Sequence, residues 1–366
     1  MIIKRFSAES FRNIEKCEIE FSPGVNLIHG KNAEGKTNAV EGIYYFSRGK
    51  SFRAREEKEL ISFGKSGFRI SIEYEERDGV GTLEYSLFGK ERRRIKNGYR
   101  ISRVTEMIGS FRTVLFVPDD LGLVKMGPDE RRSFLNIAIS QCFPAYVSCY
   151  SDYKIALENR NALLKNASKG NYYDERELIV WSEQMAKYAA EIYKFRSEYI
   201  KKLEFYAKGV MKDISDGKEE LSFVYKCDLE GDGEGAKELY KKKLTSNLEK
   251  EKIVGQSLYG PHRDDLEIYV NGKPARYYAS QGQQRSVVLS LKLAEGEVSK
   301  EICGEYPVFL FDDVLSELDE RRRSYLLEGI GERQIIITSC EADEMLSFAD
   351  RVIEVNGGSY VSTYRK

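Results

Sequence analysis

The stretch that decides the fold is Gly30-Lys31-Asn32-Ala33-Glu34-Gly35-Lys36-Thr37. It lies between a short apolar run, residues 25–29, and a segment with helical spacing, residues 38–48. A glycine-containing loop that connects a strand to a helix and ends in Gly-Lys-Thr matches the Walker A, or P-loop, pattern. The backbone N–H groups of such a loop, together with the helix N-terminus, can hold phosphates. The sequence therefore predicts a site for ATP or GTP, built from all the residues of this loop.

Two side chains of the loop have predicted roles of their own. We expect Lys36 to neutralise the β and γ phosphates, which makes it a catalytic residue as well as a binding one. We expect the Thr37 hydroxyl to ligate Mg²⁺. ATP and Mg²⁺ are accordingly the predicted cofactors.

A second motif is the apolar run Val308–Phe311 followed by Asp312 and Asp313. Such a strand delivers carboxylates to the C-terminal edge of a parallel sheet, where ligands gather, and this is the Walker B pattern. We predict that Asp312 orients the Mg²⁺ shell and that Asp313 is the general base that positions the attacking water. The alternative, a helix N-cap, is disfavoured by the apolar run before the pair. Residues 316–319 resemble the D-loop of ABC-type ATPases, with Asp319 as a candidate nucleotide contact.

The stretch Ser280-Gln281-Gly282-Gln283-Gln284-Arg285 lies between these two motifs in the chain. It resembles the signature of ABC-type ATPases, in which a serine and a glycine open a helix whose N-terminus faces a γ-phosphate. That resemblance implies that Ser280, Gly282 and Gln283 complete the nucleotide site of a second subunit, so that ATP is sandwiched between two chains. Taken alone, the stretch is explained equally well as a polar helix cap.

The first part of the chain alternates polar and apolar residues, as half-buried strands do. Strands are expected at the N-terminus and over residues 17–21 and 25–29. Residues 68–101 contain alternating runs separated by turn residues, which indicates an antiparallel meander. A buried strand over residues 114–117 completes this part.

Helical periodicity takes over from about residue 131 to residue 252. One strand, Leu221–Tyr225, is expected within this region. We therefore predict a helical lobe over residues 126–255, inserted into a head made of residues 1–125 and 256–366. The clearest helical sign is a stripe of large apolar residues spaced by three or four, a pattern typical of core: Tyr188, Ile192, Phe195, Tyr199, Leu203 and Tyr206.

Strands and helices alternate in the C-terminal part of the chain. This alternation implies a parallel sheet with helices on its faces. The predicted fold class is therefore α/β: a P-loop ABC-ATPase head whose mixed sheet includes an antiparallel β meander, interrupted by a mainly α-helical lobe. The expected strands are residues 266–270, 273–279, 308–311, 335–338 and 351–355, and the expected helices are residues 281–298 and 320–329.

Composition limits the location and the partners. Charged residues make up 32% of the chain and hydrophobic ones 41%, which is typical of soluble globular proteins. The N-terminal segment carries charges throughout and lacks the apolar core of a secretory signal, so we expect a cytoplasmic protein that does not bind membranes. The six cysteines have no CxxC spacing, which favours reduced structural thiols. Because the formal net charge is −1, any nucleic-acid binding must come from local basic patches.

Further segments resemble the RecF-like family of ABC-headed proteins, in order and over the length of the chain. The resemblance implies that Arg12 and Asn13 also contact the nucleotide. It also explains the compact helical lobe, since chromosome-structure ATPases carry long coiled-coil arms at that point instead. The matching segments are Phe11-Arg12-Asn13, residues 32–38, Lys50-Ser51-Phe52-Arg53, Phe116–Leu121, Gly127-Pro128 with Arg131–Leu135, Gly260–Asp265 and Asp312–Asp319, which leads into Arg321–Arg323.

The resemblance implies a function in recombinational DNA repair and replication. Proteins of this kind are expected to bind DNA as ATP-dependent homodimers at single-strand gaps and junctions, to work with RecR and RecO, and to promote RecA loading. Slow, DNA-stimulated ATP hydrolysis would release them. No histidine follows residues 335–337, where transporter ABC ATPases carry one against the γ-phosphate, and slow hydrolysis fits its absence. No glutamine equivalent to the ABC Q-loop can be assigned.

Two further features lead to specific expectations. Ala33 stands where many phosphate loops have glycine, so we expect that this position does not need a positive φ. Basic clusters are candidate contacts for single- or double-stranded DNA through phosphates, without sequence preference, although such runs are usually solvated faces. These clusters are Arg92–Arg94, Arg131-Arg132, Lys241–Lys243 and Arg321–Arg323.

Other functions share part of these motifs. The ATPase subunit of a membrane transporter has the same nucleotide motifs, but the missing histidine and the segment Gly260–Asp265 count against it. A phosphotransferase that acts on a small molecule has no use for the signature. An ABC-headed antiphage or nuclease protein would need a cluster of nuclease residues, and none is visible in the sequence.

Overall fold

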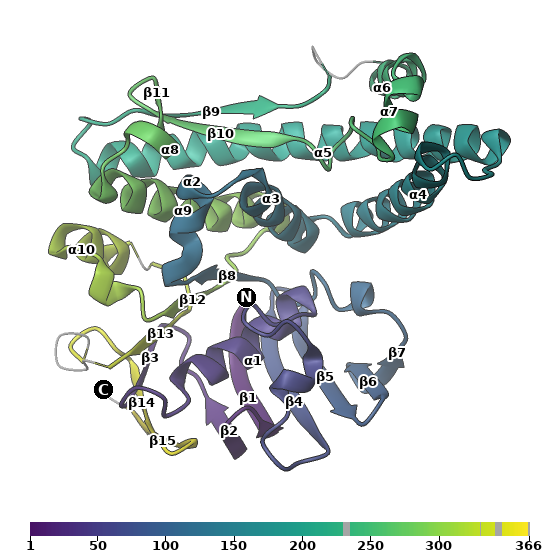
Figure 1. The fold of residues 1–366 in the computed structure, drawn as a ribbon. Coiled ribbons are helices and arrows are strands. Elements are labelled where there is room, and N and C mark those ends of the chain that lie inside the picture. Colours follow the sequence, from purple (N-terminus) through teal and green to yellow (C-terminus); the bar gives the residue numbers. More distant parts are fainter. Residues whose placement is uncertain (230–234, 330, 341–345, 365–366) are drawn as a thin grey trace.

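The computed structural model describes residues 1–229, 235–329, 331–340 and 346–364. A part made of helices lies above a part that contains two large sheets (Figure 1). Within the described ranges, no helix is both long enough and apolar enough to cross a membrane.

The sheet that carries the phosphate loop has the strand order β15-β14-β3-β13-β12-β8. Strands β14, β3, β13, β12 and β8 pair in parallel, and β15 pairs antiparallel with β14. The inner strands are runs of apolar, largely β-branched residues, as burial on both faces of a sheet requires. The predicted parallel sheet is confirmed, and β15 is an additional strand that the pattern did not indicate. The bounds are β3 Val25–His29, β8 Thr113–Phe116, β12 Val308–Asp312, β13 Ile335–Ser339, β14 Arg351–Asn356 and β15 Ser359–Tyr364.

The second sheet is antiparallel, with the order β2-β1-β4-β5-β6-β7. The predicted meander is confirmed, and so is the Asn97-Gly98 turn within its last run, whose φ values of 50° and 80° make a tight hairpin. Helix α1, Lys36–Arg48, contributes apolar side chains to the core shared by the two sheets. The strands are β1 Ile2–Phe11, β2 Ile14–Glu20, β4 Gly67–Glu76, β5 Gly79–Phe88, β6 Glu91–Lys96 and β7 Tyr99–Ile101.

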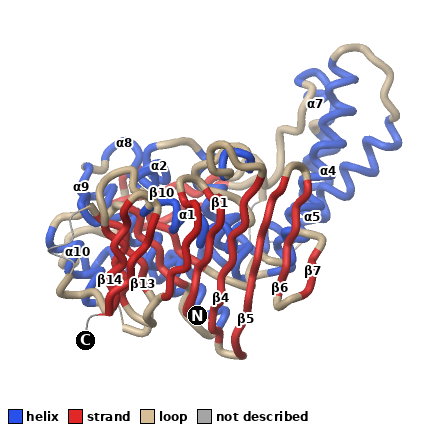
Figure 2. Tube along the Cα trace, turned by 90° about the horizontal axis from the view of Figure 1, so that it is seen from below, coloured by secondary structure: helices blue, strands red, loops and turns tan. Residues whose placement is uncertain are grey.

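The helical part is organised around α5, Glu175–Ile214. The predicted stripe along this helix lies in or against the core: Ile192, Tyr199 and Leu203 are buried, and the other members of the stripe pack partly buried beside them. Figure 2 shows that α4 and α7, with one end of α5, project from the body as an arm. The other helices are α3 Pro128–Cys142, α4 Pro144–Ser168, α6 Ala236–Ser246 and α7 Leu248–Val254.

A small antiparallel sheet, β11-β10-β9, covers one side of α5 (Figure 1). Strands β9, Leu221–Lys226, and β10, Asp265–Val270, confirm two predicted strands. The strand predicted over residues 273–279 is wrong: β11 is only Lys273–Pro274, and α8, Ala275–Tyr278, follows it. Pro274 lacks the N–H that a strand ladder needs, which explains why the pairing stops there.

Helix α9, Gln281–Cys303, belongs to both parts of the molecule. Its Val287 and Leu291 lie in the helical core, whereas Leu289 and Leu293 lie in the core on the parallel sheet. The remaining short elements are η1 Glu57–Leu60, η2 Val104–Glu106, η3 Pro118–Leu121, α2 Gly122–Lys125, η4 Leu315–Glu317 and α10 Glu320–Glu328.

Candidate functional site

The phosphate loop connects β3 to α1 and has a strained backbone. Ala33 has a φ of 68°, so the expectation that this position does not need a positive φ is wrong. Positive φ is costly for a residue with a side chain, and surrounding contacts must hold it. Gly35 has a φ of 120°, and a Cβ there would lie 2.9 Å from the Asn13 Oδ1 atom. Glycine is therefore required at 35 by both conformation and space.

The Lys36 side chain folds back over the loop. Its Nζ atom donates to the carbonyl oxygens of Gly30 at 2.7 Å and Lys31 at 2.9 Å. It also lies 3.2 Å from the Cys340 Sγ atom, at the end of β13. The residue is only 6% exposed, so a cation is held at the centre of the loop, where phosphate oxygens could replace the carbonyl acceptors.

Thr37 and Asp312 come together from opposite ends of the chain. The Thr37 hydroxyl donates to Asp312 Oδ1 at 2.8 Å, and the Thr338 hydroxyl donates to the same oxygen at 2.8 Å. Burial raises the pKa of Asp312, an effect opposed by these two hydrogen bonds and by the nearby Arg53 guanidinium, while Asp313 raises it further. A hydroxyl from the start of α1 and a carboxylate from the end of β12 thus form an oxygen donor set of the kind that Mg²⁺ prefers.

Asp313 differs sharply from its neighbour. Its side chain is exposed, its φ is 56°, and its backbone N–H donates to the Thr338 hydroxyl at 3.0 Å. A left-handed backbone at this point turns the chain out of the strand and directs the second carboxylate away from the buried position of the first. The two aspartates therefore have separate environments although they are adjacent.

Asn13 holds the phosphate loop through two hydrogen bonds. Its Nδ2 atom donates to the Ala33 carbonyl at 3.2 Å, and its Oδ1 atom accepts from Asn38 Nδ2 at 2.6 Å. On the other side, the Tyr360 hydroxyl of β15 donates to the Gly35 carbonyl at 2.9 Å. These contacts explain how the loop keeps a positive φ at Ala33.

Two other predicted nucleotide contacts have partners within the chain. The Arg12 guanidinium forms a two-pronged pair with the fully buried Glu41 carboxylate, at 2.9 and 2.7 Å, and donates to the Glu59 carbonyl at 3.0 Å. The Glu34 carboxylate accepts from the Gly357 N–H. Arg12 thus ties the turn after β1 to α1. The contact predicted between the Arg12 side chain and nucleotide stays a prediction.

The Ser280 segment begins α9 as a capping box. Ser280 Oγ accepts from the Gln283 N–H at 3.3 Å, and Gln283 Oε1 accepts from the Ser280 N–H at 2.9 Å. The predicted helix start is confirmed, and the polar cap proposed as an alternative is present as well. The two interpretations are compatible, because a capped N-terminus still presents N–H groups.

Arg322 connects this helix start to the segment after Walker B. Its guanidinium donates to the Gly282 carbonyl at 2.9 Å and to Ser286 Oγ at 2.7 Å, and it pairs with Asp319. Asp319 is also the N-cap of α10, accepting from the Arg322 N–H at 2.9 Å. The Asp319 carboxylate therefore has partners within its own chain.

A cleft of about 1040 Å³ contains Thr37, Asp312 and Asp313. Its other lining residues include Arg53 and the segment Val117–Met126, which leads from the parallel sheet to the helical part. Among the described residues, none of the Ser280 segment lines this cleft. The structure therefore brings Walker A and Walker B together and leaves the signature helix outside their cleft.

A buried ionic cluster in the cleft wall was not indicated by any sequence motif. Lys292 of α9 donates to the Leu115 carbonyl at 2.7 Å and pairs with Asp120 at 3.0 Å. One carboxyl oxygen of Glu295 is buried without a hydrogen-bond partner, and burial raises the pKa of Glu295 to about 7. The cluster joins α9 to the Val117–Met126 segment, and the spacing Lys292-x-x-Glu295 on one helix was the only available signal.

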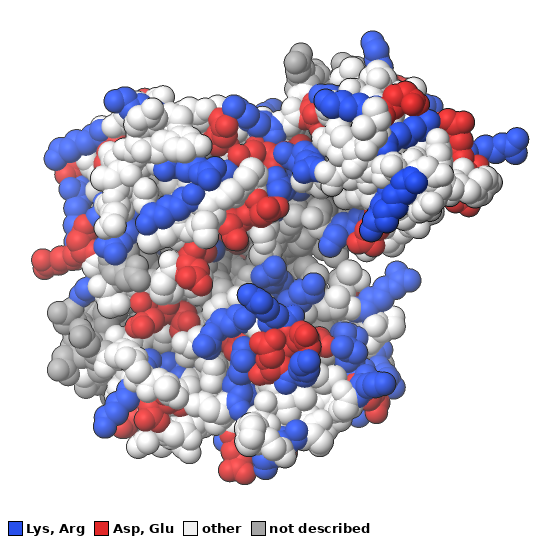
Figure 3. Space-filling model, viewed as in Figure 1, with Lys and Arg blue, Asp and Glu red and all other residues white. Residues whose placement is uncertain are grey.

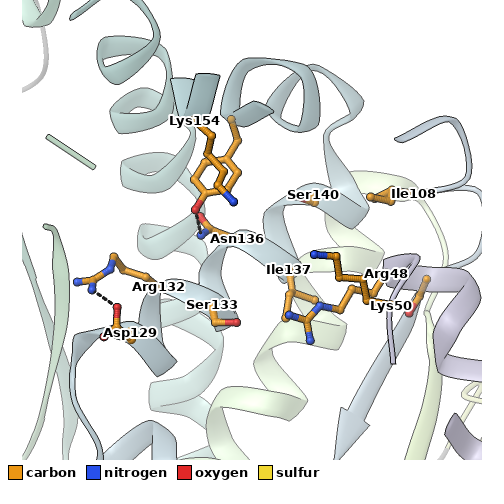
Figure 4. A pocket seen from close by; sticks show the side chains of 12 residues that line it. Arg48, Lys50, Ile108, Asp129, Arg132, Ser133, Asn136, Ile137, Ser140 and Lys154 are labelled. Atoms are coloured by element: carbon orange, nitrogen blue, oxygen red, sulfur yellow. Dashed lines mark hydrogen bonds and ion pairs between the residues drawn. The ribbon is translucent and has the colours of Figure 1, made fainter. Parts of the chain in front are cut away.

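A smaller pocket of about 350 Å³ lies where the end of α1 meets α3 and α4. Four basic residues line it: Arg48, Lys50, Arg132 and Lys154. Figure 4 shows Lys154 across the pocket from Arg48 and Lys50, and Arg132 paired with Asp129. In Figure 3, Lys and Arg side chains gather near the middle of the molecule, around the boundary between the helical part and the sheets.

The predicted basic clusters are largely engaged within the chain. Arg131 is only 5% exposed and holds Asp265 with both ends of its guanidinium, at 2.7 and 2.9 Å, so its assignment as a DNA contact is wrong. Several other members form ion pairs: Arg92 with Glu57, Lys241 with Glu183, Lys243 with Asp228 and Arg321 with Asp216.

Comparison with known proteins agrees with this geometry. The family model described as the RecF/RecN/SMC N terminal domain matches residues 2–361. The DNA replication and repair protein RecF of Clostridium beijerinckii is 36% identical over 369 residues, which cover 100% of each protein. The chain belongs to the RecF family. The RecF of Halalkalibacterium halodurans is 40% identical over 352 residues, 94% of each protein.

Solved structures agree with RecF membership. The recombination mediator protein RecF, in structures described as RecF-ATPrS and RecF-ATP in the RecFOR pathway, matches with TM-scores of 0.91 and 0.90. The identities are 33% and 32%, with 98% and 100% of this chain and 97% and 98% of those chains covered. The Smc head domain of Pyrococcus furiosus, at 19% identity and a TM-score of 0.60, shares the fold. The predicted ABC-type head is thereby confirmed.

Proposed function

We propose that this RecF-family protein is an ATP-dependent, DNA-binding switch of recombinational repair. The observation that carries the proposal is the Thr37–Asp312 contact beside the phosphate loop, with the capped Ser280 helix outside the same cleft. The first feature supports nucleotide binding within one chain. The second supports a site that a partner chain completes.

The residues present fit ATP with Mg²⁺. Helix α1 begins at Gly35 without a side-chain cap, so its first N–H groups are available to phosphate oxygens. Lys36 would neutralise the β and γ phosphates, and Thr37 and Asp312 would hold the metal ion, which polarises the γ-phosphate when bound. One of the matched RecF structures is described as RecF-ATP, which supports the same ligand.

Asp313 is the proposed general base. An exposed carboxylate beside a buried metal-ligating one can orient a water molecule toward the γ-phosphate without competing for the metal. No histidine is among the described residues that line the cleft, and we infer slow turnover from this. Hydrolysis would then act as a timer for release from DNA.

Ser280, Gly282 and Gln283 would act on the nucleotide of a second chain. Their N–H groups lie at the start of a long helix, which favours an anionic ligand at that end. Arg322 supports this assignment because it holds the Gly282 carbonyl and Asp319 together, so that the signature and D-loop segments would move as one body.

The pocket between α1, α3 and α4 is the proposed contact for DNA. Among the described residues, Arg48, Lys50 and Lys154 have no acidic partner within ion-pair distance, unlike most of the other basic clusters. Three cations around one pocket favour phosphate groups and carry no base-specific information. Binding without sequence preference follows.

The biological setting is inferred from the relatives. Proteins named DNA replication and repair protein RecF, and structures described as belonging to the RecFOR pathway, support gap or junction binding together with RecR and RecO before RecA loading. Family membership leaves the alternative of a transporter ATPase subunit without support.

Molecular mass in solution tests the dimer. With Mg²⁺ and ATP we expect the mass to double from the monomer value. We expect Ser280→Arg to stay monomeric, because the long, positively charged arginine side chain blocks the start of α9. Ser280→Arg must still bind ATP, since its own cleft is intact. A wild-type protein that stays monomeric with ATP and DNA would contradict the role of the signature in a partner's site.

Salt dependence tests the DNA contact. We expect Lys50→Glu with Lys154→Glu to weaken DNA binding and to reduce the slope of log K against log salt by about 2, roughly one for each lost phosphate contact. Lys237→Glu with Lys242→Glu is the matched control, because this pair makes the same charge change at two exposed positions of helix α6. Equal effects at both places would mean that only net charge matters.

A further inference from the structure

Helices α3 and α9 both end in a cysteine, Cys142 and Cys303 respectively. Both helix ends lie against the residues that begin β8. The Gln141 side chain exchanges two hydrogen bonds with the Thr113 backbone, at 2.7 and 3.1 Å. A few residues after Cys303, the Val308 N–H donates to the Arg112 carbonyl at 3.0 Å. The helix ends are thus brought together although 161 residues separate them in the chain.

The two thiols lie close together: Cys142 lines a small cavity with Ser299, Cys303 lies one turn after Ser299 on the same side of α9, and each thiol shifts the pKa of the other. They share the Ser299 hydroxyl, one turn before the end of α9, and the Arg112 guanidinium as neighbours. A small cavity beside them is lined by Arg112, Cys142 and Ser299 among others. Both cysteines are free and partly exposed, so a small reagent can reach them.

The surrounding groups give the two thiols different pKa values. The neighbouring Cys142 lowers the pKa of Cys303 to about 6, with Arg112 and Ser299 acting in the same direction and burial and Glu305 opposing. The neighbouring Cys303, with burial, raises the pKa of Cys142. The other titratable group facing both is the buried Tyr199. At neutral pH, Cys303 is therefore the more readily ionised of the two thiols, and Cys142 keeps its proton.

Three other cysteines have environments that act in the opposite direction. Burial raises the pKa of Cys17 to about 12 and that of Cys149 and Cys227 to about 11. A thiolate is the reactive form of cysteine, so reaction with disulfides should be selective for Cys303.

We propose that Cys142 and Cys303 form a reversible disulfide that joins α3 to α9 when low-molecular-weight disulfides accumulate. The Cys303 thiolate attacks a sulfur of the small disulfide, forms a mixed disulfide and releases one small thiolate. The Cys142 thiol then loses its proton to solvent and attacks the Cys303 sulfur, which releases the second small thiolate. The two protein thiols are oxidised and the small disulfide is reduced to two thiols, so electrons and atoms balance.

The bond would fix two elements that border the nucleotide cleft. Helix α3 follows the Val117–Met126 segment of the cleft wall, and α9 begins at Ser280. Any motion of the helical part that separates the ends of these helices would be blocked. The regulatory consequence rests on the proposed ATP-driven switch, whereas formation of the bond does not.

Peptide mapping tests the bond directly. After incubation of the whole protein with glutathione disulfide, non-reducing digestion should give a peptide that joins Cys142 to Cys303, and dithiothreitol should remove it. Cys149→Ser should retain the product, and Cys142→Ser should stop at a mixed glutathione adduct on Cys303. A glutathione adduct on Cys303 of the wild type, without the 142–303 bond, would overturn the proposal.

A second measurement does not depend on how variants fold. Alkylation of the wild type by iodoacetamide, followed by mass spectrometry as pH is raised, should show Cys303 reacting at least tenfold faster than Cys149 at pH 7. Equal rates at the two sites would overturn the assignment of Cys303 as the attacking thiol.

Regulation is tested with the oxidised protein. We expect the 142–303 disulfide to change ATP-dependent dimerisation, with recovery on reduction and no effect of oxidant on Cys142→Ser. If the disulfide forms but dimerisation is unchanged, the regulatory role fails while the bond stands. If the reduced wild type does not dimerise at all, it is the proposed function that fails.

Discussion

At the scale of single residues, Asp312 and Asp313 are the clearest example of position deciding chemistry. They are adjacent in the chain, but one is 6% exposed and accepts hydrogen bonds from Thr37 and Thr338, whereas the other is exposed on a left-handed backbone. Their substitutions should therefore separate metal binding from water activation.

We expect Asp313→Asn to bind ATP with unchanged affinity and to hydrolyse it at least about 100-fold more slowly, because a general base is lost. Asp312→Asn should weaken Mg²⁺-dependent ATP binding as well. Single-turnover hydrolysis and titration with a fluorescent ATP analogue distinguish the two. Wild-type hydrolysis by Asp313→Asn would mean that another group positions the water.

His262 provides a pH dependence of stability. Its Nδ1 atom lies 2.6 Å from the Tyr153 hydroxyl and its Nε2 atom 3.1 Å from the Ser257 carbonyl, and burial lowers its pKa to about 4. The unfolded chain, with a histidine pKa of about 6.5, binds the proton more readily. Stability should therefore fall as pH drops from about 6.5 to 4, by about 3 kcal/mol in total.

Urea unfolding at several pH values checks this slope. In His262→Gln the free energy of unfolding should depend less on pH between 6.5 and 4. The variant should be less stable at every pH, because Tyr153 loses its histidine partner. His29→Gln is the matched control, as His29 is the other histidine of the chain. An unchanged slope in His262→Gln would assign the effect to carboxylates instead.

At the scale of elements, Lys292 connects α9 to the segment that lines the nucleotide cleft. Lys292 is 8% exposed, and its ammonium group pairs with Asp120 and donates to the Leu115 carbonyl near the end of β8. Asp120 in turn accepts from the Val117 N–H at 2.8 Å and so closes the turn η3. A helix, a strand and a turn are held together by one cation.

We expect Lys292→Met to lower the free energy of unfolding by about 3 to 5 kcal/mol, because it leaves the Asp120 carboxylate buried without its partner. Asp120→Asn keeps an oxygen for the Val117 N–H, and its combination with Lys292→Met should cost less than the sum of the single changes. Chemical denaturation of the four proteins gives the coupling energy. Additive effects would show that the pair contributes nothing of its own.

At the scale of the whole molecule, α9 is shared by the helical core and the core on the parallel sheet. The two parts are also tied by the Gln141 side chain of α3, which exchanges two hydrogen bonds with the Thr113 backbone of β8, at 2.7 and 3.1 Å. Because one helix supplies both cores, neither core can lose it and remain intact. We expect the two parts to unfold together.

The single tryptophan, Trp181, packs against the helical core and reports on that part alone. Its fluorescence change in urea should coincide with loss of hydrogen-exchange protection in β12. ATP with Mg²⁺ at about 100 times its dissociation constant should stabilise both signals equally, by about 2.7 kcal/mol. A Trp181 transition that does not respond to nucleotide would show two independent units.

Local patterns predicted most of the elements and the residues of the cleft. Three elements could each be predicted from their own local sequence, because they depend on residues that are neighbours in the chain. They are the loop at 30–37, the strand that ends at Asp312 and the start of α9 at Ser280. The strand expected over residues 273–279 failed because alternation cannot distinguish a strand from a short helix after Pro274. The predicted boundaries of the lobe at residues 126 and 255 stay a prediction.

Local sequence patterns were enough to predict the phosphate loop, the strand that ends at Asp312, the helical stripe and the parallel sheet, because backbone chemistry and hydrophobic periodicity are local properties. Tertiary packing alone sets the positive φ of Ala33, the pairing of Arg12 with Glu41, the Lys292 cluster and the meeting of Cys142 with Cys303. Each of these depends on groups that are distant in sequence. Their environment, and hence their charge and reactivity, exists only once the layers have packed.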